Sequence, residues 1–498
     1  MKKTKLLIFI TAFAVFMTIG IQAYESEQEF ETGCVDENTA VTYIPDISGD
    51  AELAGESFED YILENLRDVE TEIDISRFNF KLGDINELTN KYAGVIYLNY
   101  DVYYALTGFN YSYYPVSGII STIRPKYYTT DKNQINAYKR QMELRLNEIL
   151  SYTDDSMTDI QKLITVYDRI ILEAEYDNTL TRRTAKDLLI DGTAVCSGYT
   201  TTLCALANKL NIPSGVIRSN EMNHIWNVLY IDGEWYHADA TWDDPTNDKY
   251  SRVNHTHFLK SDDWMTDVGR HYGFNKANAD STKYDDAFWN DVNSSIITVD
   301  GKMYYVIKTG SSYSLCSRDE MGRENVLYSF NEKWYSSPNG FNYWIEAYSG
   351  LCYYNERLYF NTASAIKSVD MDGKNPKTVY TLEDEKQYSI YGCFSDGNLL
   401  RFGVGKKDAP NSGKKLDREY IELDKEPEYV AGDMTGDDCV DVNDAILLLQ
   451  YSLFPELYPI SYPESLDFTG DGTVDMNDAI LVLQHSLFPE LYPLGGNY

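Results

Sequence analysis

The segment between residues 191 and 245 holds the residue types of a thiol-based acyl-transfer site. Cys196 comes directly before a run of apolar side chains at helical spacing, which are Tyr199, Leu203, Leu206 and Leu210. This spacing places the sulfur at the amino terminus of a helix, where the partial positive charge and the free N–H groups favour a thiolate. The same N–H groups can hold an oxyanion. We therefore expect Cys196 to act as a nucleophile.

A thiolate nucleophile needs an imidazole base, and the imidazole needs an acceptor that orients it. Residues 224–231 and 234–241 have the pattern of two strands, and the Asp-Gly pair between them is a strong signal for a two-residue hairpin turn. If Ile231 pairs with Glu234, the second strand places Asp239 opposite Trp226, two positions from the partner of His224. His224 and Asp239 are then diagonal neighbours on one face, about 7–8 Å apart at the backbone.

Other residues compete for these roles. Cys204 lies two helical turns after Cys196 in an apolar stretch, where a buried, inert thiol is expected. His237 shares the face of Asp239 but lies nearer the turn, opposite Val228, and stays an alternative base.

Further polar residues follow the second strand. Asp243 and Asp244 lie beside Pro245 and are expected to form a turn. His255 and His257 could suggest a metal site, but the sequence shows no carboxylate set next to them. We expect a surface or packing role for both.

Three motifs in this region resemble those of the transglutaminase-like superfamily, close to its bacterial, secreted branch. They are Val195–Tyr199, His224–Asn227 and Trp235–Trp242, and the similarity extends over about residues 59–264. The resemblance implies a papain-like α+β core with Cys196 as nucleophile, His224 as base and Asp239 as its orienter, and no cofactor for catalysis. The usual His-Ala-Trp is His-Ile-Trp here. No side chain matches an oxyanion donor, so the backbone N–H of Cys196 is the one donor expected.

The last part of the chain is an internal duplication. Asp433–Pro459 recurs 34 residues later as Asp467–Pro493, with 21 of 27 positions identical. Each copy places side-chain oxygens at loop positions 1, 3, 5, 9 and 12 and a backbone carbonyl at position 7, the spacing with which a loop surrounds a calcium ion. The ligands expected for two calcium ions are Asp433, Thr435, Asp437, Cys439, Asp441 and Asp444, then Asp467, Thr469, Asp471, Thr473, Asp475 and Asp478.

Each loop continues into a helix that Pro455 or Pro489 ends. This duplicated loop and helix, over residues 432–495, resembles a type I dockerin. The resemblance implies calcium-dependent folding and docking onto a cohesin module of a cellulosome scaffoldin. Asp438 stands at loop position 6, where glycine is expected.

Length and composition limit the remaining possibilities. The chain has 498 residues and a formal net charge of −35, so phosphate backbones are repelled and nucleic acid is an unexpected partner. The hydrophobic content of 43% supports real cores, and the length suggests about three domains. The seven cysteines show no paired spacing, which argues against a disulfide framework and leaves at least one thiol free.

These signals predict a multidomain α+β chain. A basic start and a short apolar run suggest a signal peptide, hence a secreted, cellulosome-associated protein with no integral membrane anchor after cleavage. The middle region repeats short aromatic strands, either propeller-like or as a β-sandwich. The expected parts are 1–23 signal peptide, 24–56 flexible acidic leader, 57–150 amino-terminal α/β region, 151–285 transglutaminase-like core, 286–425 tyrosine-rich β-repeats, 426–431 linker and 432–498 small all-α calcium-binding dockerin.

Apolar periodicity predicts where the helices lie in the amino-terminal half. Helices are expected at 58–66 and 85–97, around Ile135–Ile149, and from Ser156 onward with a capping box to Asp159. Short strands are expected at 73–75 and 78–80.

The sequence therefore favours a scaffold-docked thiol acyl-transfer enzyme that hydrolyses or cross-links protein or peptide substrates. The alternative is a non-catalytic subunit whose aromatic β-region binds carbohydrate or protein. A glycoside hydrolase ranks last, because no paired carboxylates stand out.

Overall fold

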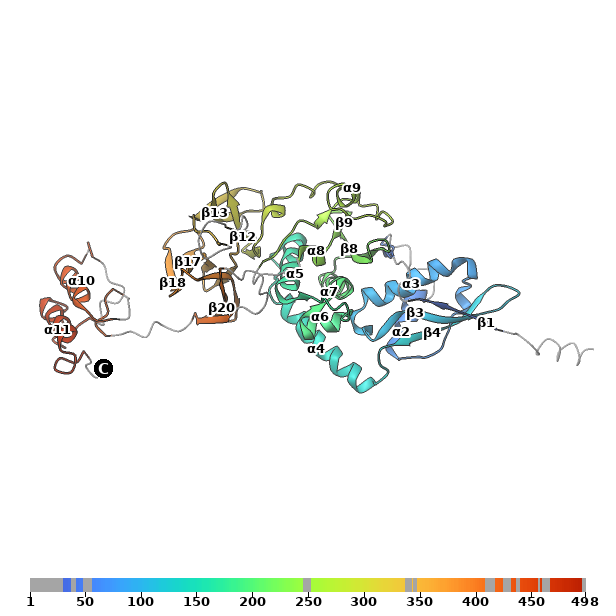
Figure 1. Ribbon diagram of the computed structural model, residues 1–498, viewed down its shortest axis with the longest axis horizontal. Coiled ribbons are helices and arrows are strands. Elements are labelled where there is room, and N and C mark those ends of the chain that lie inside the picture. The colour runs from blue at the N-terminus through green and yellow to red at the C-terminus, as the bar shows by residue number, and fades with distance from the viewer. Residues whose placement is uncertain are drawn as a thin grey trace, which may run out of the picture. The chain divides into compact units, whose positions relative to one another are not determined.

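A computed structural model of the chain divides into two compact units, Met1–Tyr420 and Ile421–Tyr498 (Figure 1). No helix in the described part of the chain is long and apolar enough to span a bilayer. The expected signal peptide lies outside the described residues. The structure describes residues 30–36, 42–47, 56–244, 252–335, 343, 347–407, 417–423, 431–435, 439–455, 457–458 and 466–494.

The amino-terminal part is an antiparallel sheet with two helices. The strand order is β1-β3-β4-β2. The elements are β1 (Glu31–Val35), α2 (Phe58–Arg67), β2 (Ile73–Asp74), α3 (Ile85–Leu98), β3 (Ala105–Tyr113) and β4 (Ile120–Tyr127). The two predicted helices are confirmed. The strand predicted at 78–80 is wrong, because Ser76–Phe78 is a 3₁₀ turn and Asn79 takes a left-handed φ of 59° that ends any extended run.

Part of the segment that was expected to be a flexible leader is held in place by two sheets. Strand β1 pairs along β3 over its whole length. Tyr43 forms a two-way backbone bridge with Val216, at 2.9 and 2.8 Å. A Cβ atom added to Gly94 would lie 2.3 Å from the Tyr43 ring, so this glycine makes room for the ring. The expectation of a flexible segment is therefore wrong here, since backbone pairing and one aromatic contact outweigh the acidic composition.

The central part places one buried helix against an antiparallel sheet of order β10-β9-β8-β7. Helix α7 contacts β8 through its apolar face, as the helical spacing predicted. The elements are α4 (Lys132–Leu150), α5 (Asp159–Glu173), β5 (Glu175–Tyr176), α6 (Ala185–Asp191), β6 (Thr193–Ala194), α7 (Cys196–Lys209), β7 (Ser214–Ser219), β8 (His224–Ile231), β9 (Glu234–Ala238), α8 (Ala240–Asp243), β10 (Phe258–Lys260) and α9 (Asp262–Asp267).

Helix α5 begins two residues later than its sequence signal suggested. The capping box is made by Thr158 and Gln161, with backbone-to-side-chain distances of 2.9 and 3.3 Å. Ser156 instead bonds to Asp154 in the preceding turn. The sequence contains two overlapping cap patterns, Ser156 with Asp159 and Thr158 with Gln161. The second one caps α5.

The hairpin of β8 and β9 has the predicted register. Ile231 pairs with Glu234, and Val228 pairs with His237. Asp232 and Gly233 both have positive φ, 54° and 84°, which is the conformation of a type I′ turn. The second strand is shorter than predicted, because it ends at Ala238 and the chain then turns into α8.

The middle region consists of three consecutive antiparallel sheets whose strands follow chain order. The recurring sequences 301–306, 356–361 and 397–402 lie at β12, β16 and β20, the second strand of each sheet. The described strands form no closed barrel. Trp334 is fully buried and bonds to the Ile390 carbonyl at 2.6 Å, so it fills a core rather than lining a groove. Trp344 lies outside the described residues.

The strands of the first sheet are β11 (Ile297–Val299), β12 (Lys302–Thr309), β13 (Ser312–Arg318) and β14 (Glu324–Phe330). The second sheet has β15 (Leu351–Tyr354), β16 (Arg357–Asn361), β17 (Ala365–Asp370) and β18 (Lys377–Thr381). The third has β19 (Tyr388–Asp396), β20 (Leu399–Lys406) and β21 (Asp417–Glu422).

The carboxyl-terminal unit is small and helical. Helices α10 (Val442–Leu453) and α11 (Met476–Leu487) stop just before the two prolines, as predicted. The residues that form its small core are Ala445, Leu448, Leu466, Ala479 and Val482.

Candidate active site

Cys196 is the first residue of α7, as predicted. The residue before it, Val195, offers no side-chain cap. The thiol lines a cavity of about 160 Å³ that His224 also lines. Burial raises the pKa of the Cys196 thiol, but the hydrogen bond and charge of His224 and the backbone N–H of Ile225 outweigh it, so the pKa is lowered. The site therefore favours a thiolate.

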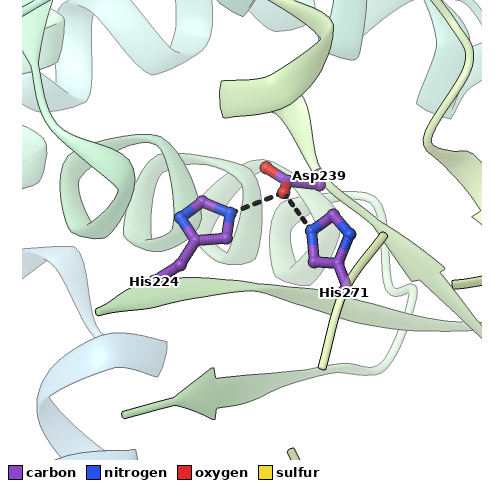
Figure 2. A group of neighbouring side chains, drawn as sticks. All are labelled: His224, Asp239 and His271. Atoms are coloured by element: carbon purple, nitrogen blue, oxygen red, sulfur yellow. Dashed lines mark hydrogen bonds and ion pairs between the residues drawn. The ribbon is translucent and has the colours of Figure 1, made fainter. Parts of the chain in front are cut away.

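His224 opens strand β8, between the thiol and a carboxylate. Its Nε2 lies 2.6 Å from Oδ2 of Asp239 (Figure 2). Because Nε2 is engaged there, Nδ1 is the ring nitrogen left for the hydrogen bond with Cys196. Burial lowers the pKa of His224, but the charge and hydrogen bond of Asp239 raise it to about 10. An imidazolium beside a thiolate is the resulting charge state.

Asp239 divides its two oxygens between a helix and the site. Oδ1 accepts the backbone N–H groups of Thr241 at 3.0 Å and Trp242 at 3.2 Å, which caps α8. Oδ2 faces His224 and a second histidine, His271. Burial raises the pKa of Asp239, but the two histidines lower it overall. The residue predicted to lie inside β9 is thus a helix cap, and its carboxylate still reaches His224.

His271 belongs to no motif of the sequence and was not among the predicted site residues. Its Nε2 lies 2.9 Å from Oδ2 of Asp239, and its Nδ1 lies 2.8 Å from the Gly269 carbonyl (Figure 2). Both ring nitrogens of His271 therefore lie within hydrogen-bond distance of an acceptor oxygen. His224, Asp239 and His271 are also the one group of described residues whose ligand atoms are close enough for a metal ion, within 4.8 Å. Their hydrogen bonds already satisfy these atoms.

The two competitors occupy other roles. His237 accepts the Trp226 indole N–H at 2.9 Å and bonds to Asp262 at 2.8 Å, away from the cavity of Cys196. Burial lowers the pKa of His237. Cys204 is fully buried, and burial raises the pKa of its thiol to about 12. The predicted burial of Cys204 is confirmed, and the raised pKa favours its neutral thiol form.

Asp243 and Asp244 are not turn formers. Asp243 is fully buried and accepts the Tyr167 hydroxyl at 2.8 Å and the His257 ring at 3.0 Å. Asp244 accepts the hydroxyl of Tyr199. The neighbouring proline suggested a surface turn, but α8 directs both carboxylates into the interior.

Almost every histidine of the chain is paired with an aspartate. His255 bonds to Asp168 at 2.7 Å in the interior, which confirms a packing role rather than a surface one. The pairs are His224–Asp239, His237–Asp262, His255–Asp168, His257–Asp243 and His271–Asp239. Of six histidines in the sequence, only His485 lies outside this set.

The second loop of the duplicated segment is folded around Asp467. The backbone N–H groups of Gly470, Asp471 and Gly472 donate to its carboxylate at 2.7–3.1 Å. Asp478 is buried and accepts the backbone N–H groups of Thr469 and Asp475. These bonds close the loop, as a calcium loop requires.

The first loop is closed in the same way where it is described. Asp444 accepts the N–H groups of Met434, Thr435 and Asp441. Asp437 lies outside the described residues. From residue 431 onward the sequence has nine aspartates and three glutamates but no lysine or arginine. Hard oxygens without a basic side chain in the same segment fit the ligand preference of calcium.

Comparisons with known proteins agree with the two motif sets. Residues 148–240 match the family model of the transglutaminase-like superfamily. Residues 431–485 match the model of the type I dockerin domain. The chain therefore carries a transglutaminase-like core domain and a carboxyl-terminal type I dockerin domain. No curated protein matches the chain.

Solved structures align with parts of the chain. A TGase aligns at 13% identity with a TM-score of 0.20, covering 24% of this chain and 41% of that one. A proposed cysteine protease from Cytophaga hutchinsonii aligns at 17% identity and 0.18, covering 27% and 53%. The tricorn protease aligns at 13% identity and 0.19, covering 42% and 21%. The chain spans about half or less of each of these structures.

Proposed function

We propose that this chain is an extracellular, scaffold-docked thiol acyl-transfer enzyme that hydrolyses protein or peptide substrates. The observation that carries the proposal is the arrangement of Cys196, His224 and Asp239. A thiol with a lowered pKa begins a helix and lines a cavity with a histidine whose other nitrogen is held by a buried carboxylate. This is the geometry of an activated sulfur nucleophile.

The reaction follows from these charges. The Cys196 thiolate attacks the acyl carbonyl carbon, an S–C bond forms, and the carbonyl electron pair moves to oxygen. The first-turn N–H of Cys196 stabilises this oxyanion. When the C–N bond breaks, the leaving amine takes the proton of the His224 imidazolium, and a thioester stays on the enzyme. His224 then accepts a proton from water, the water oxygen attacks the thioester, and the thiolate leaves.

Water is the proposed acceptor. Solvent reaches a thioester unless the cleft excludes it, so hydrolysis is the default outcome and amine transfer needs an additional acceptor site. An assay that supplies a primary amine and detects a stable cross-linked product would instead identify a transferase.

The dockerin implies association with an extracellular cellulosome and binding to a cohesin module of a scaffoldin. We propose that calcium at the two loops holds α10 and α11 in the binding conformation. Both helices expose apolar side chains at duplicated positions, which is unusual for a solvated helix and fits a docking face. These exposed pairs are Val442 and Met476, Ile446 and Ile480, Leu453 and Leu487, and Phe454 and Phe488.

A thiol-reactive active-site probe tests the enzyme proposal. We expect stoichiometric labelling of the wild-type chain, complete loss in Cys196→Ala and full retention in Cys204→Ala, because only the first thiol is activated and lines a cavity. Mass spectrometry of the labelled peptide provides the measurement.

Two histidine variants complete this test. His224→Ala should lower the acylation rate at least about a hundredfold, since it removes the proton donor and acceptor. His237→Ala should lower it far less, with thermal melting used to correct for lost packing. Equal losses in two folded variants would contradict the assignment of the base. If the wild-type chain is never labelled, the result favours the alternative function, a non-catalytic binding subunit.

A further inference from the structure

An arginine lies next to the nucleophile. Arg218, on β7, lines the same cavity as Cys196 and His224. Burial raises the pKa of Tyr97, a residue of α3, while the charge of the nearby Arg218 and its side-chain hydrogen bonding lower it. The Nε atom of Arg218 is buried and has no hydrogen-bond partner. The group is thus held by a neutral hydroxyl, with its donors only partly satisfied.

A second arginine stands at the rim of this cavity. The exposed Arg183 also lines it. The hydroxyl of Ser197, the residue after the nucleophile, donates to the Arg183 carbonyl at 2.6 Å and so fixes this segment beside α7. The guanidinium of Arg183 donates one long hydrogen bond, 3.4 Å from Nε to the Leu180 carbonyl.

Neither arginine is neutralised within the described part of the chain, where no carboxylate lies within ion-pair distance of Arg218 or Arg183. Arg182, which precedes Arg183 in the chain, does have a carboxylate partner, because its guanidinium forms an ion pair with Asp191 at 2.8 Å. The sequence has 78 acidic and 43 basic residues. Two guanidinium charges without carboxylate partners therefore lie beside one thiol, and a bound anion would pair with Arg218, whose Nε is buried without a partner.

We propose that Arg218, assisted by Arg183 at the rim, binds a carboxylate of the acyl donor, so that the substrates are acidic peptides with a carboxylate near the scissile carbonyl. The inference rests on the proposed function and names its substrate class. Guanidinium and carboxylate form paired, charge-assisted hydrogen bonds, which set the orientation of the donor as well as its affinity.

Arg218 has one competing role. It could stabilise the Cys196 thiolate instead of the substrate. That role would raise the reactivity of the thiol toward every electrophile, whereas carboxylate binding favours anionic electrophiles alone. A ratio of two alkylation rates separates the two roles.

The first experiment compares iodoacetate with iodoacetamide as alkylating agents of Cys196. The two differ in carrying a carboxylate or a neutral amide. The variants are Arg218→Gln, which removes the charge, Arg218→Lys, which keeps it, and Arg182→Gln as the matched control. His224 is present in all of them, so its own attraction for anions cancels in the comparison.

We expect the iodoacetate-to-iodoacetamide rate ratio to fall about tenfold in Arg218→Gln, to be partly restored in Arg218→Lys and to be unchanged in Arg182→Gln. The fall should shrink at high salt, because screening weakens the attraction. An unchanged ratio in Arg218→Gln would overturn the proposal, as would an equal loss of both rates. No alkylation of Cys196 in the wild-type chain would instead refute the proposed enzyme.

The second experiment measures binding without turnover. Full-length Cys196→Ala is mixed with two pools of short peptides of randomised uncharged residues that differ only in glutamate or glutamine at one fixed position. The carboxylate site is supported if Cys196→Ala captures the glutamate pool selectively and the double variant with Arg218→Gln does not. This result does not require a known substrate. Equal capture of both pools overturns it.

Discussion

Asp239 connects the charge of the active site to the start of a helix. One oxygen caps α8 and the other is shared by His224 and His271. Burial raises the pKa of Asp239, but the charge of His224 and the hydrogen bonds of both histidines lower it overall, so Asp239 stays ionised. In the proposed mechanism, a carboxylate that stays charged holds the His224 ring in one orientation.

The pH dependence of thiol alkylation tests this charge balance. A free cysteine thiol has a pKa of about 8.5. Since the pKa of Cys196 is lowered, the rise of its alkylation rate with pH should be centred below that value. In Asp239→Asn the pKa of His224 falls, the ion pair weakens and the rise should move up by about one pH unit or more. A stopped-flow profile of both proteins provides the measurement, and coincident profiles would contradict the ion pair.

Stability should follow pH in a defined direction. The pKa of His224 is about 10 in the folded chain against about 6.5 for a free histidine. A histidine whose pKa is raised stabilises the fold fully below the unfolded value and loses that contribution as pH rises through the folded one. The contribution of the His224–Asp239 pair to the free energy of unfolding should therefore decline between about pH 6.5 and 10.

The proximity of Cys196, His224 and Asp239 could be predicted because each of these residues belongs to a regular pattern. Cys196 precedes a helical repeat, and His224 and Asp239 flank a hairpin whose turn residues determine its register. His271 belongs to no repeat, and it lies 32 residues from its partner in an irregular loop. Only the folded chain brings it to Asp239.

At the scale of elements, the amino terminus of α7 depends on a small residue. A Cβ atom on Gly198 would lie 2.5 Å from the Ala194 side chain and 2.9 Å from the carbonyl of Thr184. Thr184 caps the amino terminus of α6. The first turn of α7 can approach α6 this closely only because no side chain stands there. The position of Cys196 therefore depends on a glycine two residues later.

Replacing this glycine should affect both stability and reactivity. Gly198→Ala forces the first turn of α7 to move and should cost about 1–3 kcal/mol of folding free energy, as overpacking does. It should also slow labelling of Cys196, because the thiol moves relative to His224. Urea unfolding and probe labelling give the two measurements.

Gly233→Ala is the matched control. This glycine has a φ of 84° but no atom within 4 Å of an added Cβ, so the substitution costs about 1–2 kcal/mol of backbone strain alone. Labelling should be unchanged. If Gly198→Ala labels at the same rate as Gly233→Ala, close packing at α7 does not position the nucleophile.

Element boundaries were predicted less well than element types. The helix cap at Thr158 and the end of β9 at Ala238 each lie within a few residues of the expected place. Near an end, several side chains can satisfy the same backbone groups, and tertiary packing chooses among them. The strand expected at 78–80 does not form, because Asn79 takes a left-handed backbone conformation.

At the scale of the whole molecule, the two compact units should respond differently to calcium removal. The small core of the carboxyl-terminal unit cannot offset the twelve acidic side chains from residue 431 onward without cations, so a chelator should unfold it and abolish cohesin binding. Probe labelling of Cys196 should stay unchanged. Limited proteolysis, cohesin pull-down and labelling in the same samples provide the readouts. Cohesin binding that persists in excess chelator would rule out the calcium requirement.

The pairing of the residues before α2 has a practical consequence for anyone who shortens this protein. Composition suggests starting at residue 57, yet that cut would remove β1 from β3 and Tyr43 from Val216. Two sheets would then present bare hydrogen-bonding edges, which recruit extended chains and lead to aggregation. A shortened chain that precipitates would thus indicate a missing edge strand, and a version that retains residues 30–56 is the one to crystallise.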